Sequence, residues 1–269
     1  MSPVDVQRGS SALVLAFPHA GTDAPEEIAG ALNDVGRALA DTDWHIDRLY
    51  QGLVDDATTV RATFHRYVID ANRDPDGGSL YPGQNTTTLC PLTDFDGREI
   101  YRAGAAPDAR EIDRRRRSYH APYHEALAAE LARVRDLHGH AILYDCHSIR
   151  SHVPFLFEGE LPVLNVGTNG GVTCAPAIEA SVYGRAVASG FDAVLNGRFK
   201  GGWTTRHYGR PADALHAIQM EIAQRAYLAD EAPPWRYCAE TAEPLRAVLR
   251  EMLSALLAPD IDLTEDAHR

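Results

Sequence analysis

Two short apolar runs along the chain are each followed closely by a histidine. Residues 12–17 precede His19 by one proline, and residues 141–144 precede His147 by two residues. Each run is apolar throughout, which is typical of a buried strand, and we expect the second strand to end near residue 145. In open α/β sheets, ligands bind beyond the carboxyl ends of the strands, so both imidazoles are expected at one edge of a sheet.

The rest of the pattern predicts alternating helices and strands. Apolar residues recur at helical spacing in segments 25–38, 44–55, 111–137 (with a break near Pro122), 176–189 and 245–257. Shorter β-rich segments lie at 58–64, 67–71, 193–195 and 216–221. Alternation of strands with helices predicts an α/β fold with a mostly parallel sheet and helices on both faces.

Two long segments, 72–108 and 149–173, show little periodic pattern. Irregular segments of this length are uncommon in compact domains and are usually functional, so the first is a candidate cover for an active site. The chain has no internal repeat and no low-complexity linker. We therefore expect a single domain with its core at about residues 12–258.

Composition narrows the classes of protein. The 269 residues are 45% hydrophobic and 24% charged, as in ordinary globular proteins. The net charge of −12 argues against a nucleic-acid partner, which would need a basic face. No apolar run is long enough to cross a membrane and no secretory signal is recognisable, so no membrane partner is expected. Four scattered cysteines without CxxC spacing fit a reducing cytoplasm.

The two strand-end histidines are candidate metal ligands. A hydrolytic zinc site usually takes three protein ligands from His, Asp or Glu and leaves one position for water. Asp43 and Asp47 are four residues apart and would share one face of a helix, so either could be the third ligand. The alternative is that each histidine is an ordinary core residue and each aspartate caps a helix or lies at the surface.

Two cationic segments are candidate anion sites. Asn72 and Arg73 end a β-rich segment, and the planar fork of arginine suits a carboxylate. A second group is interleaved with glycines and contains Arg198, Lys200, Arg206, His207 and Arg210. Local positive charge in an acidic protein favours an anion pocket, although a solvated basic loop fits the charge pattern equally well.

Glu221 is a candidate general base. Strand alternation places Gln219 and Glu221 on one side of segment 216–221. A carboxylate beside a metal site can take a proton from water and then donate it. The alternative from spacing alone is an exposed glutamate at the start of a helix. The chain contains no GxSxG, GxGxxG, P-loop or HExxH motif.

Taken together, these segments resemble the N-formylglutamate deformylase (N-formylglutamate amidohydrolase) family. The matching motifs occur in the family's order between residues 12 and about 228: FPHAGT (17–22), DTDWHIDRLY (41–50), YVIDANR (67–73), LYPGQ (80–84), DCHSIR (145–150), LNGRFKGG (195–202), RHYG (206–209) and HAIQME (216–221). The departures are Ala20, Ala71 and Cys146, where Ser, Leu and Ala are common. None of them removes a side chain that the chemistry requires.

The resemblance implies a fold and a set of site residues. The family is distantly similar to zinc carboxypeptidases and aspartoacylase-type deacylases, which implies a three-layer α/β/α sandwich with a mostly parallel mixed sheet and a divalent metal, with Zn²⁺ as the first candidate. The metal ligands carry over onto His19, Asp47 and His147. Asp47 ranks above Asp43 because the broader group keeps the matching acid more strictly. An Asn-Arg pair that binds carboxylate carries over onto Asn72 and Arg73, and the general base onto Glu221.

The implied activity is hydrolysis of N-formyl-L-glutamate to formate and L-glutamate, in histidine degradation. The substrate has two carboxylates, for which Asn72-Arg73 and the group containing Arg198, Lys200 and Arg206 provide cations. One alternative is a related zinc hydrolase, such as a carboxypeptidase or another N-acyl amino acid deacylase. Another is a non-catalytic binding protein for acidic amino acids, in which the histidines, aspartate and Glu221 need not converge.

Overall fold

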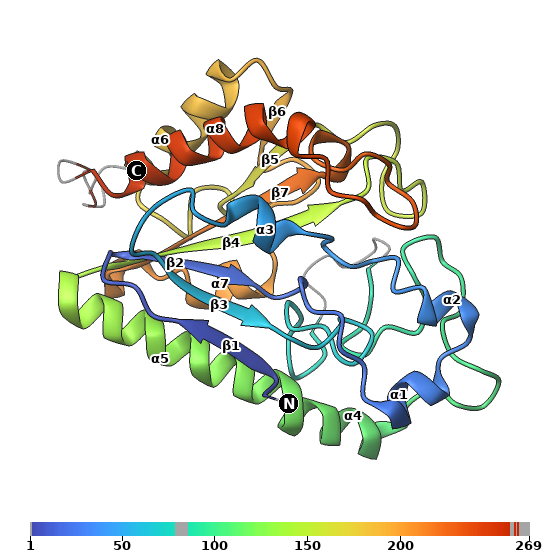
Figure 1. Ribbon diagram of the computed structural model, residues 1–269. Coiled ribbons are helices and arrows are strands. Elements are labelled where there is room, and N and C mark those ends of the chain that lie inside the picture. The colour runs from blue at the N-terminus through green and yellow to red at the C-terminus, as the bar shows by residue number, and fades with distance from the viewer. Residues whose placement is uncertain (1, 79–85, 259–260, 262, 264–269) are drawn as a thin grey trace.

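A mixed β-sheet forms the centre of the computed structural model, which describes residues 2–78, 86–258, 261 and 263 (Figure 1). Within these residues the sheet has seven strands: β1 (Val4–Gln7), β2 (Leu13–Phe17), β3 (Thr58–Ala62), β4 (Ala141–Ile149), β5 (Leu164–Gly167), β6 (Ala193–Leu195) and β7 (Leu215–Ala223). They are ordered β1-β3-β2-β4-β7-β5-β6. Neighbours β3-β2, β2-β4, β4-β7 and β5-β6 are parallel. Because only β1-β3 and β7-β5 are antiparallel, the sheet is mixed and mostly parallel, as predicted.

Helices cover both faces of the sheet (Figure 1). One face packs against α3 (Ile46–Tyr50), α6 (Pro176–Ala188) and α8 (Ala239–Leu256). The other packs against α5 (Ala121–His138) and α7 (Trp203–Tyr208). The predicted three-layer α/β/α architecture is therefore confirmed. No helix among the described residues combines the length and apolar character needed to cross a membrane.

Several predicted elements need correction. Segment 25–38 forms two helices, α1 (Glu26–Ala31) and α2 (Asp34–Arg37), because Leu32 is extended and Asn33 caps the second helix. Segment 44–55 contains only the short helix α3. Segment 111–137 begins earlier, as α4 (Ala109–Arg115), and passes through a π-helical turn, η1 (Arg116–His120), into α5.

The strands also differ from the sequence prediction. Strands β1 and β5 were not predicted, and β5 lies inside the segment 149–173 that was expected to be irregular. Residues 67–71 form turns rather than a strand. Segment 72–108 is irregular up to α4 wherever it is described; residues 79–85, which include the LYPGQ motif, lie outside the described residues. Single 3-10 turns occur at η2 (Pro211–Asp213) and η3 (Gln224–Ala226).

The face of the sheet toward α5 and α7 changes character along β4 and β7. Its first residues are apolar and buried, with Ala141 and Leu143 on β4 beside Leu215 and Ala217 on β7. The next positions on the same face are Asp145 and His147, beside Gln219 and Glu221. Strand β4 runs to Ile149, so His147 lies within the strand rather than after it.

Candidate active site

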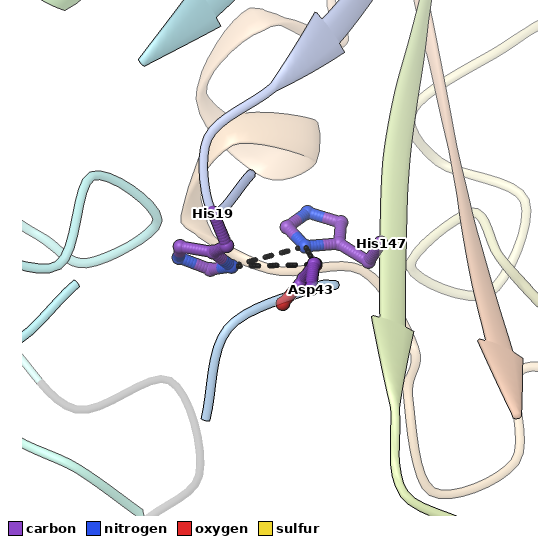
Figure 2. Close-up of side chains that lie close together, drawn as sticks. All are labelled: His19, Asp43 and His147. Atoms are coloured by element: carbon purple, nitrogen blue, oxygen red, sulfur yellow. Dashed lines mark hydrogen bonds and ion pairs between the residues drawn. The ribbon is translucent and has the colours of Figure 1, made fainter. Parts of the chain in front are cut away.

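Three buried side chains from separate parts of the chain meet at the carboxyl end of the sheet (Figure 2). His19 follows β2, Asp43 precedes α3, and His147 lies on β4. The Nδ1 atoms of the two histidines are 3.2 Å apart. Oδ2 of Asp43 is 3.3 Å from Nδ1 of His147 and 3.8 Å from Nδ1 of His19.

This spacing fits a shared metal ion. A tetrahedral zinc with bonds of about 2.0–2.1 Å holds its ligand atoms about 3.3–3.5 Å apart. The three observed separations lie within a few tenths of an ångström of that range. Two imidazole nitrogens and one carboxylate oxygen are also a donor set that zinc commonly takes, and three ligands leave room for water.

The other nitrogen of each imidazole faces a carboxylate. Nε2 of His19 is 2.7 Å from Oδ1 of Asp70, and Nε2 of His147 is 3.1 Å from Oδ1 of Asp145. Metal-binding histidines usually donate their second ring N–H to such a group, which fixes the tautomer and the orientation of the ring. For His19 this contact is a hydrogen bond, which leaves Nδ1 facing the cluster. For His147 it is an ion-pair distance, and Nδ2 of Asn72 also lies 3.2 Å from Nε2 of His147.

Asp43, not Asp47, is the acidic residue beside the histidines. Its Oδ1 accepts a hydrogen bond from Arg66 at 3.2 Å, and its Oδ2 accepts one from the backbone N–H of Ser148 at 3.0 Å. The side chain of Asp47 is 42% exposed and lies 4.0 Å from Arg61. The choice of Asp47 was wrong in this geometry.

The helix expected to carry both aspartates is also broken between them. Residue 43 precedes α3, because His45 adopts a left-handed conformation (φ 60°) at the start of that helix. Asp43 and Asp47 therefore do not share a helix face. The backbone N–H of Asp43 donates to the carbonyl of His19, which ties this segment to the end of β2.

The electrostatics of the cluster also favour a cation. Burial lowers the pKa of His19 to about 4, so the ring is neutral and able to bind a metal. Burial raises the pKa of Asp43, but Arg66 and the two histidines outweigh it and hold this pKa below its usual value. Four carboxylates are buried around the two imidazoles: Asp43, Asp70, Asp145 and Glu221. An added divalent ion would offset this concentration of negative charge.

Glu221 is held beside this cluster by the sheet. The strand register pairs it directly with His147, so the two side chains leave the same face of neighbouring strands. Nε2 of Gln219 donates to Oε2 of Glu221 at 3.2 Å, and the backbone N–H of Gly202 donates to Oε1 of Gln219 at 2.6 Å. Burial raises the pKa of Glu221 to about 8, so this carboxyl is ionised at neutral pH only when a nearby cation, such as a bound divalent metal, lowers its pKa. Glu221 lies within β7, so the alternative of a helix start is excluded.

A cavity of about 80 Å³ opens onto these groups. Polar and charged side chains form part of its lining: His19, His147, Glu221, Arg66, Asn72, Arg73 and Arg198. Apolar walls come from Phe95, Ile149, Leu156 and Phe199. A cavity with several converging cations, a carboxylate and a metal-type cluster suits a small anionic molecule.

Comparison with known proteins identifies the family. A family model described as N-formylglutamate amidohydrolase matches residues 11–228. The chain belongs to the N-formylglutamate amidohydrolase family. The resemblance drawn from the sequence motifs is thus confirmed, and every candidate residue from His19 to Glu221 lies within the matched span.

Individual relatives agree with this assignment. The N-formylglutamate deformylase of Pseudomonas aeruginosa is 49% identical over 254 residues, which cover 94% of this chain and 95% of the relative. The N-formylglutamate deformylase of Pseudomonas putida is 44% identical over 253 residues, covering 93% and 94%. The crystal structure of N-formylglutamate amidohydrolase from Ralstonia eutropha JMP134 superimposes with a TM-score of 0.77 at 25% identity, covering 95% of this chain and 98% of that one.

The predicted substrate-binding residues separate into two groups. Asn72, Arg73 and Arg198 line the cavity, whereas Lys200 and Arg206 are not among the described residues that do so. Lys200 is exposed, and Nε of Arg206 donates to the carbonyl of Gly201 at 2.8 Å. Only part of the predicted cationic group therefore faces the site.

Arg73 is oriented by the irregular segment that follows it. Its Nε donates to the carbonyl of Thr87 at 3.0 Å, and its second terminal nitrogen donates to Oγ1 of Thr87 at 2.8 Å. Asn72 accepts a hydrogen bond from the backbone N–H of Thr204 at 2.9 Å. Segment 72–108 thus contributes Thr87, which orients Arg73, and this contact was not predicted from the sequence.

Arg66 was not predicted as a site residue. Its guanidinium is buried, faces Asp43 and lies 4.9 Å over the ring of Phe95. Its Nε has no hydrogen-bond partner among the described residues. Its position in the sequence could have suggested a site role. Arg66 lies between His65 and Tyr67, at the start of the segment that ends in Asn72-Arg73.

Proposed function

We propose that this protein hydrolyses N-formyl-L-glutamate to formate and L-glutamate, and that it acts in histidine degradation. The observation that carries the proposal is the family match over residues 11–228, which contains every residue of the site. The relatives named N-formylglutamate deformylase, at 49% and 44% identity, support the same substrate. The small cavity with several cations is consistent with a short dianion.

His19, Asp43 and His147 are the residues that would hold a divalent metal, with zinc favoured by the donor set. When bound, such an ion makes water more acidic and polarises the formyl carbonyl. Asp70 and Asp145 keep the two imidazoles in the orientation that binding needs. Arg66 keeps Asp43 ionised and in place.

Glu221 moves the protons in this proposal. One oxygen of its carboxylate takes a proton from the attacking water and later delivers it to the nitrogen of the leaving glutamate. Gln219 occupies Oε2, which leaves Oε1 for this exchange. Arg66 lines the cavity, so it is our candidate for stabilising negative charge on the carbonyl oxygen.

Two cationic groups bind the carboxylates of the substrate. Asn72 and Arg73, which we call the carboxylate clamp, bind one of them, and Arg198 binds the other. The net charge of −12 repels a dianion, so binding depends on these local charges.

Formate release tests the proposal. Purified protein is assayed for formate release from N-formylglutamate and N-formylglutamine and for acetate release from N-acetylglutamate, each with and without a chelator. We expect rapid release only from N-formylglutamate, and its loss with chelator. Equal kcat/KM for N-formylglutamate and N-formylglutamine would show that no cation reads the side-chain carboxylate and would favour a less selective deacylase. Activity that survives complete metal removal would contradict the metal-dependent mechanism.

A further inference from the structure

Two buried histidines outside the metal cluster contact the backbone on either side of Asn72. Nε2 of His120, the last residue of η1, lies 3.0 Å from the carbonyl oxygen of Arg73. Nε2 of His124, one turn later in α5, lies 2.8 Å from the carbonyl oxygen of Ala71. The spacing of four residues places both imidazoles on one face of the helix.

These contacts fix the tautomer of both rings. A carbonyl oxygen can only accept, so Nε2 carries the hydrogen in each case. The hydroxyl of Tyr208 lies 3.1 Å from Nδ1 of His124 and 3.2 Å from the carbonyl oxygen of His124, so its single hydrogen has two acceptors on this residue. Both rings are neutral in this arrangement, because burial lowers the pKa of His120 and lowers that of His124 to about 3.

The segment that they contact has no strand to hold it. Residues 67–73 form turns and irregular backbone with no strand, so the sheet ladder does not fix the backbone of the carboxylate clamp. Helix α5, by contrast, is packed against the sheet along its length. The ring of Trp203, at the start of α7, also lies against His120 and His124, with centroid distances of 5.8 and 4.8 Å. The two histidines therefore connect the clamp to rigid elements.

A second metal site is not supported at this position. Within the described residues, the metal-capable grouping is His19, Asp43 and His147. The Nε2 atoms of His120 and His124 already donate to carbonyls. Their geometry is that of donors to backbone.

We propose that His124, assisted by His120, is a positioning residue that holds the backbone of Asn72 and Arg73 in the conformation that binds a substrate carboxylate. This inference rests on the proposed function, since it assumes that the clamp binds carboxylate. His124 does not touch the reacting atoms. Its removal should raise KM more than it lowers kcat, because Asp145, His147 and the Gln219–Glu221 pair stay on the sheet. A smaller loss of kcat is expected as well, since Asn72 contacts Nε2 of His147 at 3.2 Å and its backbone N–H donates to Asp70.

A matched pair of substitutions isolates the contact with Ala71. The amide nitrogen of glutamine lies about where Nε2 of histidine does, whereas that of asparagine lies nearer Nδ1. His124→Gln should keep the donor to Ala71, and His124→Asn should lose it. We expect His124→Asn to raise KM about tenfold, as for one lost hydrogen bond with misplacement of the clamp, and His124→Gln to change it by less than about threefold. His138→Asn, which removes a similar contact to the carbonyl of Ser10 at the far end of α5, is the control and should match wild type.

Substrates that lack one carboxylate provide the decisive readout. N-formylglutamine lacks the side-chain carboxylate, and 4-formamidobutanoate lacks the α-carboxylate. If the clamp binds one of these carboxylates, the rise in KM caused by His124→Asn should disappear for the substrate that lacks that carboxylate. An equal penalty for all three substrates would mean a general structural role and would overturn the proposal.

Binding of L-glutamate, measured by calorimetry, separates this inference from the proposed function. We expect His124→Asn to weaken binding about tenfold and His124→Gln to preserve it. If wild type released no formate but this difference held, the proposed function would fail and the inference would stand. If wild type releases formate but His124→Asn and His124→Gln bind L-glutamate equally well, the inference is refuted and the proposed function stands. If His124→Asn does not fold, as judged by thermal melting, the pair His120→Gln and His120→Asn makes the same test at Arg73.

Discussion

The site is built from two kinds of backbone, which are held in different ways. One half lies on the neighbouring parallel strands β4 and β7 and comprises Asp145, His147, Gln219 and Glu221. The other half lies on connecting segments and comprises His19, Asp43, Arg66, Asn72 and Arg73. The ladder sets the positions of the first group, whereas individual hydrogen bonds set those of the second.

This difference predicts where the site is sensitive to change. On the strands, loss of a supporting side chain leaves the backbone of a catalytic residue in place, so the effect should be confined to the chemistry. On the connecting segments, the same loss also releases the backbone. Substitutions in the two halves should therefore differ in what they disturb.

The largest effect is expected at Glu221 on β7. Glu221→Gln should lower kcat by about 10²–10⁴-fold, because the amide cannot accept the proton of water. Metal content and melting temperature should stay at wild-type values, since the ladder holds the position. Glu251→Gln, an exposed glutamate on α8, is the matched control. Near wild-type kcat in Glu221→Gln would remove Glu221 from the mechanism.

Arg73 tests the connecting half. Arg73→Ala should raise KM by roughly 30- to 150-fold, equal to about 2–3 kcal/mol; this is the lower part of the range for a lost charge pair, because the arginine side chain is 26% exposed. Arg73→Lys should restore binding only in part, since lysine lacks the planar fork. Steady-state kinetics measures both. Full rescue by lysine would show that charge alone matters and that the bidentate geometry is wrong.

Asp70 and Asp145 compare the two halves directly, because each supports one histidine. Substituting such a partner typically costs about 10–100-fold in metal affinity. Asp70→Asn should lower metal affinity by an amount near the upper limit of this range. His19 lies beyond the end of β2, so its position depends on the contact with Asp70. Asp145→Asn should lie near the lower limit, since β4 also holds His147. Competition with a metal chelator measures both affinities, and the reverse order would contradict the comparison.

The smallest effect is expected at Lys200. Lys200→Ala should change kcat/KM by less than about threefold, because the side chain is exposed and lies away from the described lining of the cavity. Arg198→Ala should have a clearly larger effect on KM. Equal losses for both variants would return Lys200 to the substrate site.

The strand-borne half was accessible from the sequence for a physical reason. Apolar runs and two-residue alternation report directly on strands, so they indicated the neighbourhood of His147 and the shared face of Gln219 and Glu221. The three-layer architecture followed from the alternation of helices and strands. The short edge strand β1 and the four-residue β5 were missed because so few residues carry little periodic signal.

The connecting half was only partly accessible. His19 and the pair Asn72-Arg73 were found through strand-end position and motif. A continuous helix was assumed that left Asp43 and Asp47 equivalent, and the family resemblance then favoured Asp47. The helix does not run from Asp43 to Asp47, because His45 adopts a left-handed conformation. Tertiary contacts stabilise this conformation, including a hydrogen bond from Nε2 of His45 to the carbonyl of Trp235. Periodicity within one segment cannot report a contact across 190 residues. The buried position of Arg66 escaped prediction for the same reason.

Metal content of two aspartate variants tests the central claim most directly. Wild type, Asp43→Asn and Asp47→Asn are purified identically, checked for folding, and analysed for zinc bound per chain after equilibration with the same zinc concentration. The account predicts that Asp43→Asn loses most of the metal, because a ligand oxygen between the two histidines is replaced, while Asp47→Asn retains it. Retention of full metal content in Asp43→Asn with loss in Asp47→Asn would contradict the site described here.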